Sequence, residues 1–290
     1  MITGTTKLLG VIGHPVGHSL SPAMHNAALA NLGLNYVYLP FPIKPEDLET
    51  AIKGFAAVGV VGFSITIPHK QTIIPLLSEI SPLAQAVGAV NTVIRKNDQW
   101  IGTNTDVEGF LAPLQTTYKR DWSNSVALIL GNGGAARAVV AGCSQLGCKS
   151  IYVVGRNPDK LEDFRKSWTN SGFGNHLSVC PWDEIPELIP QTSLLVNTTP
   201  LGMYPNTNQS PLTKEEIKLL VPGSIAYDLI YIPSPTQFLQ QAEKQGAIAI
   251  DGLSMLVNQG AAALKMWLGV DEVPVEIMEE ALIQKLGLKN

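Results

Sequence analysis

Residues 125–138, SVALILGNGGAARA, decide the fold that we predict for this chain. An apolar run of strand length, residues 125–130, meets a glycine cluster, and the alanine-rich spacing after it suits a helix that packs tightly on a sheet. Gly131 would permit the turn, Gly133 would let backbone N–H groups approach a diphosphate, and Ala136 keeps the helix close to the strand. Glycine-rich turns also follow strands that bind nothing, so the motif alone leaves both possibilities open.

The residue after the next predicted strand narrows the choice of ligand. Strand 150–154 is followed by Gly155 and Arg156, about 20 residues beyond the glycines, where a dinucleotide fold contacts the adenosine ribose. NAD-binding proteins carry Asp or Glu there, because a carboxylate accepts hydrogen bonds from the 2′-hydroxyl. Arg156 cannot accept, but its guanidinium suits a 2′-phosphate. Unless Arg156 is only a surface residue at a strand end, the cofactor is NADP rather than NAD.

Composition excludes several classes of protein. Of the 290 residues 45% are hydrophobic, yet no apolar run approaches the ~18 residues that a membrane span needs. A net charge of −4 without a basic block argues against nucleic acid or an anionic membrane as partner. The N-terminus resembles neither a signal peptide nor a transit segment, so we expect a cytoplasmic protein.

Metal ligation is not predicted. Cys143, Cys148 and Cys180 lack the spacing of a metal site, and their odd number argues against a disulfide framework. His14 and His18 are four residues apart, but the glycines and proline around them exclude a helix that would place both on one face.

Strands and helices alternate along the chain, which predicts an α/β protein with mostly parallel sheets covered on both faces. The first series comprises strands near 7–12, 35–41 and 60–67, helices over 21–32 and 45–57, and an antiparallel hairpin over 92–103. The second series comprises strands near 125–130, 150–154, 176–180, 193–197, 224–229 and 247–250. We therefore expect two α/β domains joined near 106–124, followed by a helical tail over 253–287.

Two serines follow the first predicted strand. Ser19 and Ser21 lie beside a helix start, where hydroxyls and backbone N–H groups can hold a carboxylate. Because Pro22 suits the first helical position, Ser21 is also the predicted N-cap of that helix.

Four polar residues stand at later strand ends, where open α/β sheets bind their ligands. They are Thr66, Lys70, Asn91 and Asp106. Reduction of a ketone by a nicotinamide needs a proton for the developing alkoxide, and a paired lysine and aspartate can supply and direct one. A solvated lysine at Lys70 and a helix cap at Asp106 are the structural alternatives, and the sequence does not decide which of the two moves the proton.

Three later segments also carry polar residues, after predicted strands or in the predicted tail helices. Residues 195–203 and 227–233 each run from a strand into a polar loop, and residues 252–262 begin the tail helices. Gln259 lies in an otherwise apolar helix, so it either binds a ligand or occupies an exposed polar position.

Together these segments resemble the shikimate dehydrogenase family over nearly the whole chain. The resemblance rests on separate motifs in the right order, at 18–22, 66–70, 88–92, 104–106, 131–136, 197–203, 228–231 and 255–259. It implies reversible, NADPH-dependent reduction of 3-dehydroshikimate to shikimate, a step toward chorismate and the aromatic amino acids. It also implies a substrate domain of residues 1–106 completed by 252–290, a Rossmann-type NADP domain of residues 107–251, and an active site in the cleft between them.

The resemblance implies a role for each matching residue. Lys70 and Asp106 would be the catalytic pair. The substrate would be bound by Ser19, Ser21, Thr66, Asn91, Tyr231 and Gln259, with the serines and Tyr231 at its carboxylate. NADP would be bound by Gly131, Gly133, Gly134, Ala135, Arg156, Asn157, Thr198, Met203, Gly252 and Met255.

Two positions depart from the family pattern, and two alternatives remain. Ser64 stands where asparagine is frequent, and Asn157 replaces a Thr or Ser after the arginine. A quinate or dual quinate/shikimate dehydrogenase is the nearest alternative, and a non-catalytic NADP sensor is the more distant one, which the retained Lys70 and Asp106 argue against. The partner expected is a small-molecule substrate, and the protein is expected to be a monomer or homodimer.

Overall fold

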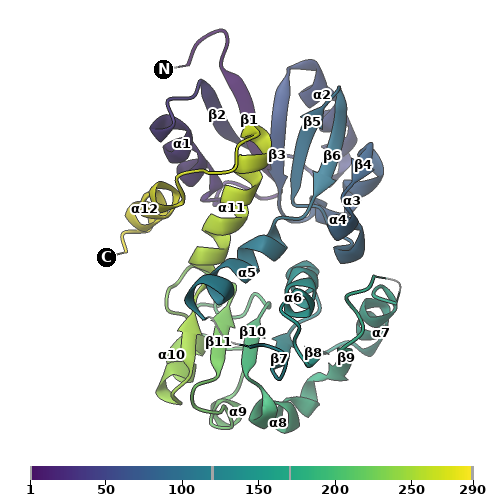
Figure 1. Cartoon of the computed structure of the whole chain (residues 1–290), viewed down its shortest axis with the longest axis vertical. Helices are drawn as coiled ribbons and strands as arrows, with labels where there is room; N and C mark the ends of the chain where they lie inside the picture. Colours follow the sequence, from purple (N-terminus) through teal and green to yellow (C-terminus); the bar gives the residue numbers. More distant parts are fainter. Residues whose placement is uncertain (1, 119–120, 170, 289–290) are drawn as a thin grey trace. The chain divides into compact units, whose positions relative to one another are not determined.

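The computed structural model describes residues 2–118, 121–169 and 171–288 (Figure 1). The chain divides into two compact units, the first formed by Met1–Gly109 with Val257–Asn290 and the second by Phe110–Leu256. The chain leaves one unit and enters the other inside helices α5 (Asp106–Thr117) and α11 (Gly252–Leu268). Lys119 and Arg120, within the predicted connection 106–124, lie outside the described residues.

The first unit contains a mixed sheet. Among the described residues this sheet has six strands, in the order β2-β1-β3-β5-β6-β4. Their bounds are β1 Lys7–Gly13, β2 Tyr36–Pro42, β3 Val60–Ile65, β4 Glu79–Ile80, β5 Thr92–Lys96 and β6 Gln99–Thr103. β1 runs parallel to β2 and β3, whereas β5 and β6 form the predicted antiparallel hairpin. Asn97 and Asp98 make its turn with φ of 50° and 59°, a conformation that Asn and Asp tolerate better than most residues.

The helical elements of the first unit, apart from α5 and α11, are α1 Ser21–Asn31, η1 Pro45–Asp47, α2 Leu48–Ala57, α3 His69–Thr72, η2 Ile74–Leu76, α4 Pro82–Val87 and α12 Val275–Leu286. α12, from the end of the chain, packs against α1 (Figure 1). Aromatic rings in edge contact contribute to the core beneath α2, where Phe63 lies 5.3 Å from Phe55 and 5.2 Å from Trp100 between ring centroids.

The predicted N-cap of α1 is wrong by one residue. Leu20 is the N-cap, and Ser21 already belongs to the helix. Ser21 therefore does not accept the capping hydrogen bond; instead its backbone N–H donates to the Ser19 hydroxyl at 3.3 Å. Its hydroxyl does not serve as the helix cap that the sequence predicted.

The second unit contains a parallel sheet. Among the described residues this sheet has six strands, in the order β12-β11-β10-β7-β8-β9. The bounds are β7 Val126–Leu130, β8 Ser150–Gly155, β9 Leu177–Pro181, β10 Leu194–Asn197, β11 Ile225–Asp228 and β12 Ile248–Ile250. Strand order reverses at β7, with β8 on one side and β10 on the other. This is the doubly wound order in which ligands bind at the carboxyl ends of the strands, beside the reversal.

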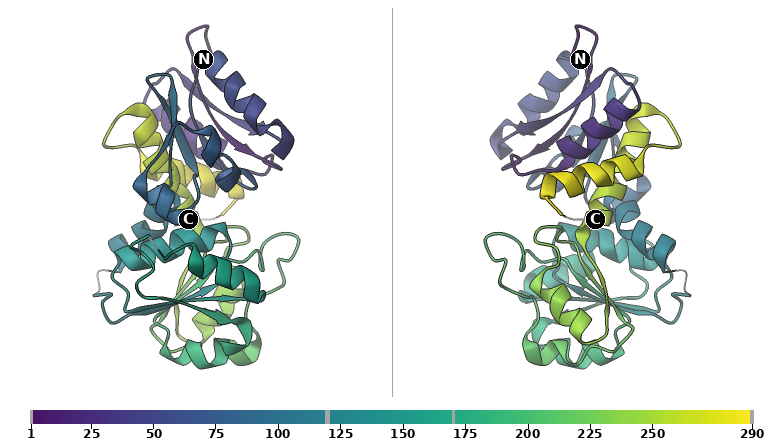
Figure 2. Two further views of the ribbon diagram at one scale, coloured as in Figure 1. Left: turned by 90° about the vertical axis from the view of Figure 1, so that its right-hand side faces the viewer. Right: turned by 90° about the vertical axis from the view of Figure 1, so that its left-hand side faces the viewer.

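Helices flank this sheet on both faces (Figure 2). They are α6 Gly134–Gln145, α7 Pro158–Lys166, α8 Ile185–Leu188, α9 Lys214–Ile217 and α10 Gln237–Lys244, with short 3₁₀ turns η3 Trp182–Glu184 and η4 Ile189–Gln191. Because both faces are covered, β7 consists of apolar side chains and so does β10 up to its last residue, Asn197; Leu128 and Leu195 are fully buried. No helix among the described residues combines the length and the apolar character that crossing a membrane requires.

Candidate active site

Lys70 and Asp106, which lie 36 residues apart in the sequence, form an ion pair in the first unit. The Lys70 Nζ lies 2.5 Å from the Asp106 Oδ2, and their side chains retain 25% and 12% of their exposure. The pair is thus largely shielded from water, which strengthens the attraction, but it is still open to a ligand. The structure confirms that these two residues, paired in the sequence analysis on chemical grounds, are in contact.

Backbone and side-chain hydrogen bonds fix the segment that carries each partner. The Val90 N–H donates to the Lys70 carbonyl at 2.8 Å, and the ring of His69 donates from Nε2 to the Ile43 carbonyl at 2.7 Å. On the other side, the Asp106 N–H donates to the Asn104 Oδ1 at 3.0 Å. The start of α3 and the start of α5 are therefore held in place on either side of the ion pair.

Asn91 binds the second oxygen of the Asp106 carboxylate. Its Nδ2 donates to the Asp106 Oδ1 at 2.8 Å and to the Thr105 Oγ1 at 3.0 Å, while its Oδ1 accepts from the Thr105 N–H at 2.7 Å. With Lys70 on one oxygen and Asn91 on the other, Asp106 cannot rotate without breaking a hydrogen bond. Asn91 is itself buried, so at least part of its function is to orient Asp106.

Gln259 and Thr66 lie at the same end of this sheet. The Gln259 Oε1, on α11, is 3.5 Å from the Asn91 Nδ2, so the tail helix reaches the cluster although the two residues are 168 positions apart. Thr66 is half-buried at the end of β3, where its N–H donates to the Ile12 carbonyl at 2.9 Å.

The serine loop follows β1 and lies beside the loop that carries Thr66, because the His14 N–H donates to the Ile67 carbonyl at 3.0 Å. Ser19 is half-buried and Ser21 is buried. The hydroxyl of Tyr38 faces Ser21 and Ser64, without a hydrogen bond of good geometry to any described residue, and burial raises the pKa of Tyr38. Hydroxyls from this loop, from β2 and from β3 thus lie together near the N-terminus of α1, as a carboxylate site requires.

The glycine turn of the second unit has the geometry that the sequence predicted. Gly131 has a φ of +101°, and a side chain there would come within 3.0 Å of the Thr198 hydroxyl, so only glycine fits without strain. Gly133 and Gly134 are exposed at the N-terminus of the twelve-residue α6, and open space surrounds both α-carbons. Ala135 is half-buried behind them. Bare N–H groups at a helix N-terminus fit a diphosphate.

The remaining predicted cofactor residues line the neighbouring strand ends. The Thr198 hydroxyl donates to the Leu130 carbonyl at 2.8 Å, so it supports the turn. Met203 is exposed and Met255 is half-buried. Gly252 is buried, and a side chain there would overlap the Leu229 carbonyl, so close packing within the unit already requires glycine at this position.

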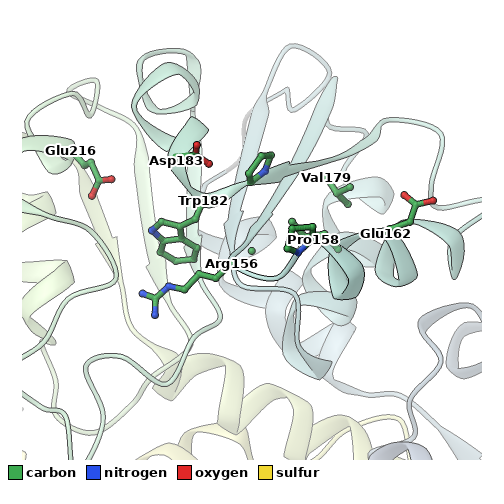
Figure 3. A pocket seen from close by; sticks show the side chains of 10 residues that line it. Arg156, Pro158, Glu162, Val179, Trp182, Asp183 and Glu216 are labelled. Carbon is green, nitrogen blue, oxygen red and sulfur yellow. The ribbon is translucent and has the colours of Figure 1, made fainter.

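Arg156 is exposed after β8 and lines a cavity of about 670 Å³ (Figure 3). The next residue, Asn157, caps α7 by accepting from the Lys160 N–H at 2.9 Å. Trp182 lies against Arg156 in the same cavity and was absent from the predicted site. Its signal in the sequence is its position after strand β9, next to the strand that Arg156 follows.

Asn197 and Asp228 join the loops that follow β10 and β11, a connection that the sequence analysis did not predict. The Asn197 Nδ2 donates to the Asp228 Oδ1 at 3.0 Å, and the Asn197 Oδ1 accepts from the Thr199 N–H at 3.0 Å. Asp228 also accepts from the Ile230 N–H at 3.1 Å. The pair therefore fixes the loop that carries Thr198 and Met203 and the segment that leads to Tyr231, whose pKa is raised by burial.

Asp228 makes the stability of the protein depend on pH. Burial raises its pKa to about 6, against hydrogen bonds from Thr236, Ile230 and Asn197 that favour the charged form. Since the folded pKa exceeds the ordinary value of 3.8, ionisation in the folded state costs free energy, and this cost disappears as the pH falls through 6 toward 4. Relative to Asp228→Asn, we expect the wild type to gain about 1 kcal/mol in the free energy of unfolding between about pH 7.5 and pH 5.

Urea unfolding of both proteins at the two pH values measures this gain. Subtracting the change in the free energy of unfolding of Asp228→Asn from that of the wild type removes the contribution of every other titrating group. Equal changes in the wild type and in Asp228→Asn would contradict the assignment.

Two family models match the chain. The model described as the shikimate dehydrogenase substrate binding domain matches residues 11–93, and the shikimate 5′-dehydrogenase C-terminal domain matches residues 252–283. The chain is 70% identical to a shikimate dehydrogenase (NADP(+)) of Nostoc sp. (strain PCC 7120) over 289 residues, which cover 100% of both chains.

Solved structures agree with these matches. A shikimate dehydrogenase crystallised in complex with NADP+ superposes with a TM-score of 0.90 at 40% identity, covering 98% of this chain and 97% of that one. The shikimate 5-dehydrogenase of Listeria monocytogenes, in complex with shikimate and NAD, superposes with a TM-score of 0.88 at 34% identity, covering 97% and 98%.

Proposed function

The chain belongs to the shikimate dehydrogenase family, and on this premise we propose that it catalyses the reversible reduction of 3-dehydroshikimate to shikimate with NADPH. The observation that carries the proposal is the Lys70–Asp106 ion pair, with both carboxylate oxygens held and the ammonium still accessible. A protein that only sensed NADP would have no use for such a pair. The Nostoc relative and the structural neighbour with NADP+ support NADP as the cofactor.

The pair performs the proton transfer. NADPH, when bound, supplies the hydride that converts the ketone carbon into an alcohol carbon. Lys70 then donates a proton from its ammonium to the developing alkoxide oxygen, and in the reverse direction its neutral amine accepts the proton of the hydroxyl. Asp106 directs the ammonium and balances its charge, while Asn91 keeps the carboxylate in place.

We assign substrate binding to residues 1–106 with 252–290. Ser19 and Ser21 hold the carboxylate at the N-terminus of α1, and Thr66, Asn91 and Gln259 select the ring hydroxyls. Their arrangement around the ends of β1, β3 and β5 supports this role. Tyr231, in the second unit, remains a predicted contact of the carboxylate.

NADP binding is assigned to residues 107–251 with the start of α11. Gly131, Gly133, Gly134 and Ala135 would hold the diphosphate, and Arg156 would hold the 2′-phosphate, with Asn157 beside it. The exposed glycine backbone at α6 and the solvent-exposed side chain of Arg156 support these roles. Thr198, Met203, Gly252 and Met255 stay predictions for the nicotinamide end. We also propose that the protein acts in the cytoplasm as a monomer or homodimer; its three cysteines form no disulfide among the described residues, which suits a reducing compartment.

The double variant Ser19→Ala with Ser21→Ala tests the carboxylate site. Each hydroxyl removed takes one charge-assisted hydrogen bond from the substrate, so we expect KM for shikimate to rise about 10- to 100-fold. KM for NADP should stay within about twofold, because the changes lie in the substrate unit. Steady-state kinetics with each substrate varied in turn measures both values, and an unchanged KM for shikimate would remove the serines from the site.

One assay separates the proposed function from its alternatives. Purified protein is mixed with shikimate or quinate and with NADP+ or NAD+ in all four combinations, and the absorbance of reduced nicotinamide is followed. We expect the highest kcat/KM with shikimate and NADP+. Comparable rates with quinate would indicate a dual dehydrogenase, and binding of NADP+ without turnover of either acid would identify a sensor.

A further inference from the structure

We propose that Trp182 is a specificity-determining residue, which holds Arg156 in the conformation that binds the 2′-phosphate of NADP. The inference rests on the proposed role of Arg156 and adds a residue that neither the family motifs nor the matched domains contain. Its basis is the contact between the two side chains, the chemistry of that contact and the way Trp182 is anchored.

The strand register brings the two side chains together. β8 and β9 are parallel neighbours, and Gly155 is paired with Pro181 at their carboxyl ends. Arg156 and Trp182 are the residues that directly follow the two strands, and the Arg156 Cζ lies 4.9 Å from the centroid of the Trp182 ring. Figure 3 shows the Arg156 side chain running alongside the indole at the edge of the cavity. This distance is within the range of a cation–π contact.

A cation–π contact restrains an arginine without using its hydrogen-bond donors. A carboxylate partner would bind the N–H groups at the edge of the guanidinium, which are the groups that a phosphate needs. An indole contacts the flat face instead and leaves all five N–H donors available. Trp182 can therefore position Arg156 and still leave it competent to bind an anion.

Three carboxylates line the cavity, those of Glu162, Asp183 and Glu216, and none of them forms an ion pair with Arg156 among the described residues. Glu162 is bound by Arg165 with distances of 2.6 and 2.8 Å, and Glu216 accepts from the Thr213 N–H at 2.7 Å. Among the ion pairs between described residues, none involves Arg156. The positive charge of the side chain thus remains available for a phosphate.

Trp182 is anchored firmly enough to act as a platform. It is half-buried at the start of η3 and packs against the core cluster that includes Ile185 and Leu188. One part of the ring is fixed in this core while Arg156 covers another. Since Arg156 would lose less rotational freedom on binding when it is already restrained, the contact should increase the affinity for a 2′-phosphate specifically.

The test compares two nucleotides that differ by that phosphate. We would measure Kd for 2′,5′-ADP and for 5′-AMP by calorimetry with the full-length protein at constant ionic strength. Trp182→Leu keeps an apolar side chain but removes the π-face, so its Kd for 2′,5′-ADP should rise about 3- to 30-fold while Kd for 5′-AMP changes less than about twofold. Equal weakening of both nucleotides, or of neither, would overturn the proposal.

Two further variants keep the test decisive. Trp182→Phe retains a smaller π-face and should weaken 2′,5′-ADP by about 2- to 5-fold, which decides the question if Trp182→Leu does not fold. Trp168→Phe is the matched control, because Trp168 stacks on a different arginine, Arg137, at 5.1 Å in the same unit. It should change the stability of the protein without changing the ratio of the two Kd values.

A double-mutant cycle separates this inference from the proposed cofactor site. Arg156→Ala alone tests the site, since an unchanged Kd for 2′,5′-ADP would mean that Arg156 does not bind the phosphate. If Arg156→Ala weakens binding, adding Trp182→Leu should have no further effect on the ratio of the two Kd values. A further change in that ratio would show that Trp182 acts independently of Arg156 and would overturn the inference alone.

Discussion

Lys70→Ala should lower kcat for shikimate oxidation by about 10²- to 10⁴-fold, the range expected when a general acid–base group is removed. A methyl group can neither accept the proton of the hydroxyl nor return it to the alkoxide. Asp106 would also lose the cation on its Oδ2 and keep only the Asn91 hydrogen bond on Oδ1. Kd for NADP should stay within about twofold, since the proposed cofactor residues belong to the other unit.

Steady-state kinetics and a direct titration of NADP measure these two effects. Lys53→Ala is the control, because Lys53 is an exposed lysine paired with Glu49 in the same unit. Rescue by a small primary amine adds a readout that a structural defect would not give, and it identifies the amine as the group that moves the proton. A kcat like that of the wild type in Lys70→Ala would remove Lys70 from the mechanism.

Arg156→Asp should raise Kd for NADP by about 10²- to 10³-fold, because it removes charge-assisted hydrogen bonds and places an anion beside the 2′-phosphate. Kd for NAD should change little or fall, since a carboxylate can accept a hydrogen bond from the 2′-hydroxyl. The same substitution is thus expected to raise Kd for NADP without raising Kd for NAD, whereas misfolding would raise both.

Fluorescence titration with NADP+ and with NAD+ gives both constants. Lys244→Asp makes the same change of charge at an exposed position on α10 in the same unit, outside the lining of the Arg156 cavity, and it controls for long-range electrostatics. If both variants weaken NADP+ equally, the effect is one of net charge and Arg156 has no special role.

Local patterns were sufficient to predict most of the fold. The glycine turn at Gly131 needs a φ that only glycine adopts easily, and the turn at Asn97 and Asp98 uses residues that tolerate positive φ. Such signals lie within a few residues, so neither depends on the rest of the chain. The N-cap predicted at Ser21 lies one residue after the observed one. Local patterns place the ends of helices only to within a residue or so, because a helix end shifts by a residue with little change in energy.

Site residues were predicted as types of side chain at strand ends, but apart from the pair Lys70 and Asp106 their hydrogen-bond partners were not. Lysine and aspartate after successive strands suggested proton transfer, and the resemblance to a family supplied the individual roles. That Asn91 holds the second oxygen of Asp106, or that Asp228 joins two loops through Asn197, could not be predicted, since each depends on distances across the sheet.

Sequence patterns alone specify the alternation of strands and helices, the dinucleotide turn and the residue types at the strand ends, because periodicity and turn chemistry act between near neighbours. Most contacts among those residues are set by the folded structure. Gln259 approaches Asn91 across 168 positions, and Arg156 contacts Trp182 because two parallel strands end in the same register. Contacts of this kind depend on strand order and register, which are set by the packing of the whole sheet and by no single segment.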